Sequence, residues 1–107
     1  MRAGELIAAY ERILEITDGM LAAARRGDWE RLTALEGDCR AEVGRLLALG
    51  DDLPRLDEPL RRRKVQIVKG VLESDAEIRR LVEPRMAELE QLIGHVRNEQ
   101  RLTRAYG

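Results

Sequence analysis

The 107-residue sequence is poor in the residue types that build sheets and disulfides. It contains no phenylalanine, aromatic residues make up 3% of it, and it has a single cysteine. One cysteine, Cys39, cannot form an intrachain disulfide, which is typical of proteins in a reducing compartment. Leucine, alanine, glutamate and arginine dominate instead, and this composition favours an all-helical domain over a β-sheet.

Long apolar runs and a dominant charge are also missing. No stretch approaches the roughly 18 consecutive apolar residues of a transmembrane helix. The 19 basic and 20 acidic side chains leave a formal net charge of −1, so no overall field attracts the chain to nucleic acid or to a membrane. Glutamates interrupt the N-terminal stretch, where a secretory signal needs continuous apolar residues. We therefore expect a cytoplasmic protein with no membrane insertion and no direct contact with nucleic acid.

Recognisable catalytic and cofactor motifs are absent from the sequence as well. It has no glycine-rich phosphate loop and no nucleophile elbow. No Glu-x-x-His spacing supplies a metal site in a helical bundle, so we predict neither a metal nor a cofactor. Cys39 lies on an apolar helical seam, where it behaves as a small hydrophobe. We interpret the protein as a non-enzyme; a phosphotransfer domain is a weaker alternative, because His95 follows a glycine at a predicted helix end.

What the sequence does contain is helical periodicity, which first defines two neighbouring helices. Residues 3–26 carry a wide apolar stripe, and Gly27 ends this helix with a left-handed cap. Asp28 caps the second helix, residues 28–49. The connection between them is so short that the two helices must be antiparallel neighbours. Glu36 falls on the apolar seam of the second helix, where we expect it to pair with an arginine of a neighbouring helix.

The longest helical pattern covers residues 57–96 and has more apolar surface than one neighbouring helix can cover. An apolar ladder with a 3.5-residue period runs along its whole length, and a second stripe runs beside it in the first half. Pro84 predicts a kink near that position. Asn98 can cap a short fourth helix, residues 98–106. The sequence thus predicts a single all-α domain over residues 1–107, an antiparallel bundle of three long helices plus a short C-terminal fourth helix.

Two features of the third helix are candidate binding surfaces. The second stripe could hold an amphipathic partner helix, and it is formed by Ile67, Val71, Ile78 and Leu81. A basic run lies where the helix dipole disfavours cations, which favours a role in docking an acidic partner; it consists of Arg61, Arg62, Arg63 and Lys64. Each feature also has a purely structural interpretation. The stripe would then belong to the hydrophobic core of the bundle, and the basic run would be a solvent-exposed face without a binding role.

Three motifs, in order along the chain, resemble the FliT family of flagellar type III export chaperones. The tryptophan motif that opens the family's second helix is matched by Trp29, Leu32 and Glu36. The family's R-M-x-E-L-x-x-L-[VI]-G run is matched by Arg85, Met86 and Leu89 with residues 92–94. Its A-Y-G ending is matched by residues 105–107. Pro84 is a departure, because the family carries an apolar residue there. We expect the part of the third helix after Pro84 to anchor the bundle.

The resemblance implies a cytoplasmic chaperone that holds the C-terminal region of the filament-cap protein FliD before export. It also implies docking on the export gate and the export ATPase complex and, in some bacteria, inhibition of the flagellar master transcription regulator FlhDC. The family's short last helix restrains binding, a role that here falls to Leu102 and Tyr106. The alternative is a generic helical adaptor or a dimeric coiled-coil module with a different client, and the surplus apolar surface equally allows a homodimer.

Overall fold

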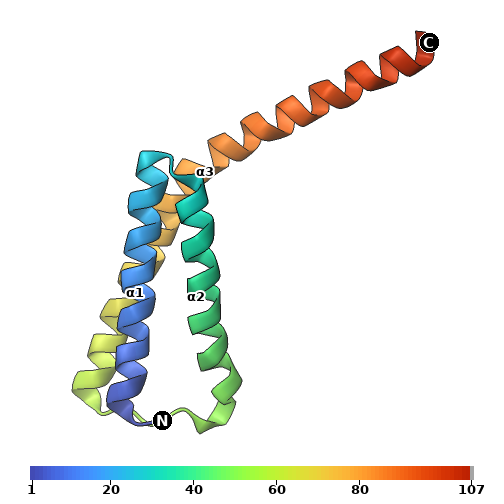
Figure 1. Ribbon diagram of the computed structural model, residues 1–107. Coiled ribbons are helices and arrows are strands. Elements are labelled where there is room, and N and C mark those ends of the chain that lie inside the picture. Colours follow the sequence, from blue (N-terminus) through green and yellow to red (C-terminus); the bar gives the residue numbers. More distant parts are fainter. Residues whose placement is uncertain (107) are drawn as a thin grey trace.

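The computed structural model describes the backbone of residues 1–106 and the side chains of residues 1–89 and 91. In this part of the chain all regular structure is helical. The elements are α1 (Ala3–Arg26), α2 (Trp29–Leu49), the short 3₁₀ helix η1 (Gly50–Asp52) and α3 (Glu58–Tyr106). Figure 1 shows α1 and α2 running antiparallel, with the first half of α3 beside α1. The predicted all-α class with three helices is confirmed.

The turn between α1 and α2 follows from two residues. Gly27 adopts φ 70° and ψ 21°, the left-handed conformation that glycine enters without a steric cost. The next backbone N–H, that of Asp28, donates to the Ala23 carbonyl at 2.9 Å. The Asp28 side chain in turn accepts from the Arg31 backbone N–H at 3.1 Å, which caps α2. One helix therefore ends and the next begins within two residues, as the sequence predicts.

The core lies along α1, because α1 packs closely against both α2 and α3. Most of the buried apolar side chains belong to α1, and α2 contributes only Leu35 to them within the described part of the chain. Near the α1–α2 turn the three helices meet in one cluster that consists of Met20, Leu35 and Ile78. Toward the end that holds the N-terminus the helices spread apart (Figure 1). The bundle is thus tightly packed at one end and open at the other.

Helix α3 continues past the bundle as one helix. Its bounds, Glu58–Tyr106, include residues 98–106, so a separate fourth helix is not confirmed. No glycine or proline lies between His95 and Tyr106, and an established helix propagates more easily than a new one nucleates. Pro84 lies inside α3, where it cannot donate to the Arg80 carbonyl. The ribbon changes direction as α3 leaves the bundle (Figure 1).

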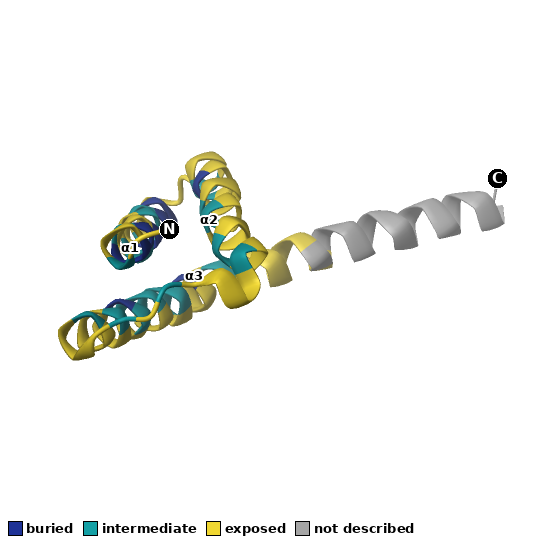
Figure 2. Ribbon diagram, turned by 90° about the horizontal axis from the view of Figure 1, so that it is seen from below, coloured by how far each residue is buried: buried dark blue, intermediate teal, exposed yellow. Residues whose placement is uncertain are grey.

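The expectation that α3 after Pro84 anchors the bundle is wrong for the side chains described. Met86 is 50% exposed and Leu89 is 41% exposed. Figure 2 shows this stretch of α3 in yellow, the colour of exposed residues. The reason is geometric: α3 has passed the α1–α2 turn by then, and neither neighbouring helix extends that far. No helix, within the part of the chain described, has an apolar stretch long enough to cross a bilayer.

Candidate functional site

An apolar groove of about 240 Å³ lies between α2 and α3, with α1 beneath it. We call it the α2–α3 groove. Its lining residues come from all three helices: Tyr10, Ile13, Val43, Leu46, Leu47, Val68, Val71 and Leu72. The groove exists because α2 and α3 each pack on α1 but make no close backbone approach to each other within the described residues. The facing sides of α2 and α3 are therefore left open.

The rim of the α2–α3 groove consists of exposed apolar side chains. Leu47 is 76% exposed and Leu72 is 62% exposed, while Val43 at the edge is 37% exposed. Complete burial of such a side chain contributes about 1.5–3 kcal/mol relative to leaving it in water. A rim of this kind gains free energy when an apolar partner covers it. The groove is therefore the strongest candidate for protein binding in the described structure.

The structure divides the predicted binding stripe between core and surface. Ile67 is fully buried and Ile78 is 6% exposed, and the latter packs against Met20 and Leu35. Val71 lines the α2–α3 groove. Leu81 is 36% exposed and lies outside the groove lining. The structure therefore brings one of the four residues into the groove, and the binding role of the stripe stays a prediction.

Sequence reasoning missed most of the groove. Val68 and Leu72 belong to the other apolar ladder of α3, which periodicity alone assigns equally well to the core. The groove residues of α2 gave one signal: Leu46 and Leu47 are adjacent and point about 100° apart, so burial of both needs a wide covering surface. Leu46 is half-buried and Leu47 points to solvent.

The predicted docking patch is partly occupied by contacts within the protein. Arg62 pairs with Glu58 on its own helix at 2.6 Å. Arg63 reaches Glu11 of α1 at 3.2 Å. The Lys64 ammonium lies 5.5 Å from the centre of the Tyr10 ring, a cation–π distance that ties α3 to α1. Arg61 has no carboxylate partner among the described side chains, so it is the residue of the run most available to a partner.

The residues of the tryptophan motif lie at the start of α2. Trp29 is half-buried, and Leu32 packs against the cluster of Met20, Leu35 and Ile78. Glu36 does not pair with a neighbouring helix as predicted, because its side chain is 54% exposed and bonds to Arg40 one turn along α2. Because α2 makes no close backbone approach to α3 within the described residues, much of the face expected to be buried points to solvent.

The other motif residues and the candidate reactive side chains form no site in the described structure. Arg85 lies 3.8 Å from Glu88 on the same helix, in an exposed pair. Cys39 is half-buried against the core cluster. The side chains of His95, Leu102 and Tyr106 lie outside the described residues. No group of three metal-binding side chains occurs within the part of the chain described.

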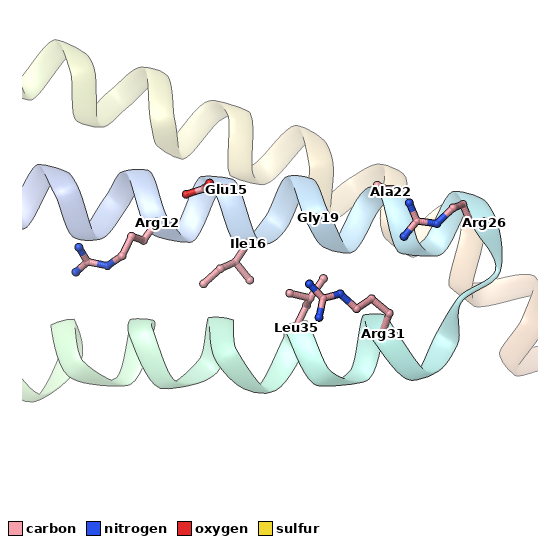
Figure 3. A pocket seen from close by; sticks show the side chains of 8 residues that line it. All are labelled: Arg12, Glu15, Ile16, Gly19, Ala22, Arg26, Arg31 and Leu35. Carbon is pink, nitrogen blue, oxygen red and sulfur yellow. The ribbon is translucent and has the colours of Figure 1, made fainter.

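A second depression, of about 430 Å³, lies between α1 and α2 (Figure 3). We call it the basic groove. It is lined by Arg12, Glu15, Ile16, Gly19, Ala22, Arg26, Arg31 and Leu35. Arg12 approaches Glu42 at 3.5 Å, and that glutamate also pairs with Arg45 at 3.1 Å. In contrast to the α2–α3 groove, this depression combines apolar residues with three guanidinium groups.

Comparison with known proteins relates the whole chain to one family. The family model for flagellar protein FliT matches residues 7–107. Flagellar protein FliT of Yersinia pseudotuberculosis serotype O:3 (strain YPIII) is 29% identical over 109 residues, which cover 99% of this chain and 88% of the relative. The protein of the same name from Yersinia pestis (strain Pestoides F) has the same identity and coverage.

A solved structure agrees with these relatives. The crystal structure of flagellar protein FliT from Bordetella bronchiseptica superposes with a TM-score of 0.70 at 31% sequence identity. The match covers 80% of this chain and 96% of that chain. The chain therefore belongs to the FliT family, whose members are flagellar proteins of the chaperone type.

Proposed function

We propose that the protein is a cytoplasmic export chaperone that binds the C-terminal region of the filament-cap protein FliD before type III export. Family membership supports a flagellar chaperone role, and the resemblance of the sequence motifs supports this client. The observation that carries the proposal is the α2–α3 groove, an exposed surface lined by apolar side chains from all three helices. A chaperone of this kind needs such a surface, because it shields apolar client residues from water until export.

The client would bind as an amphipathic helix laid into the groove. On α3 the groove extends from Val68 to Leu72 and on α2 from Val43 to Leu47, a length of about one turn on each helix at 1.5 Å per residue. Such a site suits two or three apolar anchors spaced three or four residues apart on the client. Val71 is the contact that the predicted stripe contributes, while Ile67 and Ile78 are buried in the core and do not line the groove.

Further parts of the proposal concern docking and restraint. Arg61 and the outer face of the basic run would contact the export gate or the export ATPase complex. The last residues of α3, with Leu102 and Tyr106, would compete with the client for the groove in molecules in which this part of α3 folds back on the bundle. In this view the chain would also bind FlhDC, and so inhibit it, through the basic run or the α2–α3 groove. These assignments rest on the family resemblance and on the exposure of Arg61.

Titration of a labelled peptide from the FliD C-terminal region tests the client assignment. Leu72→Glu and Leu47→Glu place a charge on the groove rim at positions that are already exposed, so the bundle should remain folded. We expect each change to weaken peptide binding by about tenfold or more, because a charge in an apolar contact is not compensated. Leu53→Glu is the matched control, since Leu53 is 40% exposed and does not line the groove. Unchanged binding by both rim variants would reject the groove as the client site.

A homodimer or another coiled-coil assembly is the second candidate, and the same exposed rim favours it. A second copy of the chain could cover the α2–α3 groove in place of a client. Sedimentation velocity at two protein concentrations separates the possibilities. A concentration-dependent dimer that Leu72→Glu dissociates supports self-association through the groove. A monomer at both concentrations leaves the groove free for the client.

A further inference from the structure

The basic groove lies on a different face of α1 from the α2–α3 groove. Arg12, Gly19 and Arg26 of the basic groove recur at helical spacing along one side of α1. Tyr10 and Ile13, which belong to the α2–α3 groove, lie on another side. A ligand in one groove therefore leaves the other uncovered.

Two arginines line the basic groove on the side of the tight turn. Arg26 is in the last turn of α1 and Arg31 is in the first turn of α2, and the turn between them reverses the chain. In Figure 3 the Arg31 guanidinium reaches into the gap beside Leu35, whereas the Arg26 guanidinium lies over α1. Neither has a carboxylate within ion-pair distance among the described side chains. The adjacent Arg25, in contrast, pairs with Glu77 of α3 at 2.6 Å.

The other end of the basic groove carries Arg12. Its counter-charge, Glu42, is shared with Arg45, so Arg12 keeps hydrogen-bond donors free for a ligand. Glu15 is the one acidic residue of the lining, and in Figure 3 its carboxylate lies away from the gap. The separation of Arg12 from Arg26 corresponds to about 21 Å of helix at 1.5 Å per residue. The groove thus has positive charge at both ends.

The floor between the two ends is apolar and closed. Ile16 of α1 and Leu35 of α2 form it, and Gly19 and Ala22 leave space above it. A Cβ atom on Gly19 would lie 3.3 Å from Leu35 Cδ1, so the two helices are in contact at this point. Ala22 is exposed and its small side chain blocks nothing. A ligand would therefore meet an apolar surface along the middle of the groove, with Arg31 beside Leu35 and the other two arginines toward the ends.

We propose that the basic groove binds an acidic amphipathic helix of a partner protein. Apolar residues of that helix would pack on Ile16 and Leu35, and its carboxylates would bond to Arg12 at one end, to Arg31 beside Leu35 and to Arg26 nearer the turn. A helix of about 14 residues spans this length. Guanidinium–carboxylate pairs of this kind are charge-assisted and can be bidentate.

The arrangement favours a protein helix over two other ligands. A small anion would reach one end of the groove only and would gain nothing from the apolar floor. Nucleic acid requires rows of cations that follow the phosphate backbone, whereas this groove has three arginines around an apolar floor and lies in a chain of net charge −1. The inference goes beyond the proposed function, because it adds a second ligand on a separate face.

The test uses the full chain and a labelled helical peptide of about 14 residues built from glutamate, alanine and leucine. The matched peptide carries glutamine in place of every glutamate. Arg26→Glu/Arg31→Glu should weaken binding of the acidic peptide by about tenfold or more, since two charge-assisted contacts become repulsive. Arg55→Glu/Arg80→Glu makes the same change in net charge at residues outside the groove lining, and it should bind within about twofold of the wild type.

A neutral blocking variant keeps the test informative if the charge reversals disturb folding. Ala22→Trp fills the groove without changing charge and should also weaken binding of the acidic peptide. The proposal is overturned if the glutamine peptide binds as tightly as the acidic peptide. It is also overturned if Arg55→Glu/Arg80→Glu weakens binding as much as Arg26→Glu/Arg31→Glu does. Displacement of the peptide by inorganic phosphate alone would indicate a simple anion site, and preferential binding of an RNA oligonucleotide would indicate nucleic acid; either result rejects the proposal. The FliD peptide should bind the basic-groove variants normally, so the two proposals can fail separately.

Discussion

Gly19 of α1 lies directly against Leu35 of α2, where an added Cβ atom would be 3.3 Å from Leu35 Cδ1. Two effects oppose each other in Gly19→Ala. Alanine stabilises a helix interior by about 1 kcal/mol relative to glycine, and the new methyl group is somewhat too close to Leu35. The contact is with the end of a flexible side chain that borders the open basic groove, so Leu35 can move slightly. We expect a small net stabilisation, measured as a higher urea midpoint.

Gly37→Ala is the matched control for this prediction. No atom lies within 4 Å of a Cβ placed on Gly37, so that change reports the gain in helix propensity alone. Gly19→Ala should therefore stabilise the protein less than Gly37→Ala does. A net loss of stability in Gly19→Ala would mean that Leu35 is fixed more firmly than its position at the groove suggests.

A different outcome is expected at Gly27, which ends α1 in the left-handed region. A Cβ placed there meets no atom within 4 Å, so the cost of Gly27→Ala comes from the backbone alone. A non-glycine residue at φ 70° costs about 1–2 kcal/mol. We expect a decrease of this size in the free energy of unfolding, measured by urea denaturation. Gly27→Asn should restore part of the loss, because asparagine tolerates this conformation better than alanine; equal stability of the alanine variant would contradict the prediction.

The helices and the first turn could be predicted from the sequence because their signals are local. Gly27 and Asp28 act on the backbone within a few residues, and a 3.6-residue period defines a helix whatever lies beside it. The groove could not be predicted in the same way. Both ladders of α3 are apolar, and only the position of α1 decides that Ile67 is buried while Leu72 is 62% exposed. Periodicity shows that a stripe exists but not which helix covers it.

The basic groove shows the same limit for charged residues. The local sequence indicates only that Arg26 is a cation near the C-terminal end of a helix, where the helix dipole favours it. That it lines one groove together with Arg31 depends on the turn and on the packing of α1 against α2, which no local pattern contains. Glu36 is a further case, since its place on an apolar seam implied burial, yet no neighbouring helix covers its side chain, which is 54% exposed.

Removal of residues 98–107 tests the proposed restraint by the end of the chain. A segment that occupies the groove part of the time lowers the apparent client affinity by the fraction of molecules that are open. The truncated protein should therefore bind the FliD peptide more tightly than the full chain. Leu102→Ala/Tyr106→Ala is the matched variant and should show the same direction of change at full length. Unchanged or weaker binding in both would reject the competition.

Ile78 and Leu72 provide the sharpest separation of core from binding surface on one helix. Ile78 is 6% exposed and packs against Met20 and Leu35, so Ile78→Ala should lower the free energy of unfolding by about 2–5 kcal/mol. Leu72 is 62% exposed, so Leu72→Ala should change stability by less than about 0.5 kcal/mol, as most exposed substitutions do. Its effect should fall on binding of the FliD peptide, because an anchor of the rim is lost. Chemical denaturation and peptide titration of the two variants measure both quantities. If Leu72→Ala loses stability and keeps full affinity, the rim belongs to a buried interface and the α2–α3 groove is not the client site.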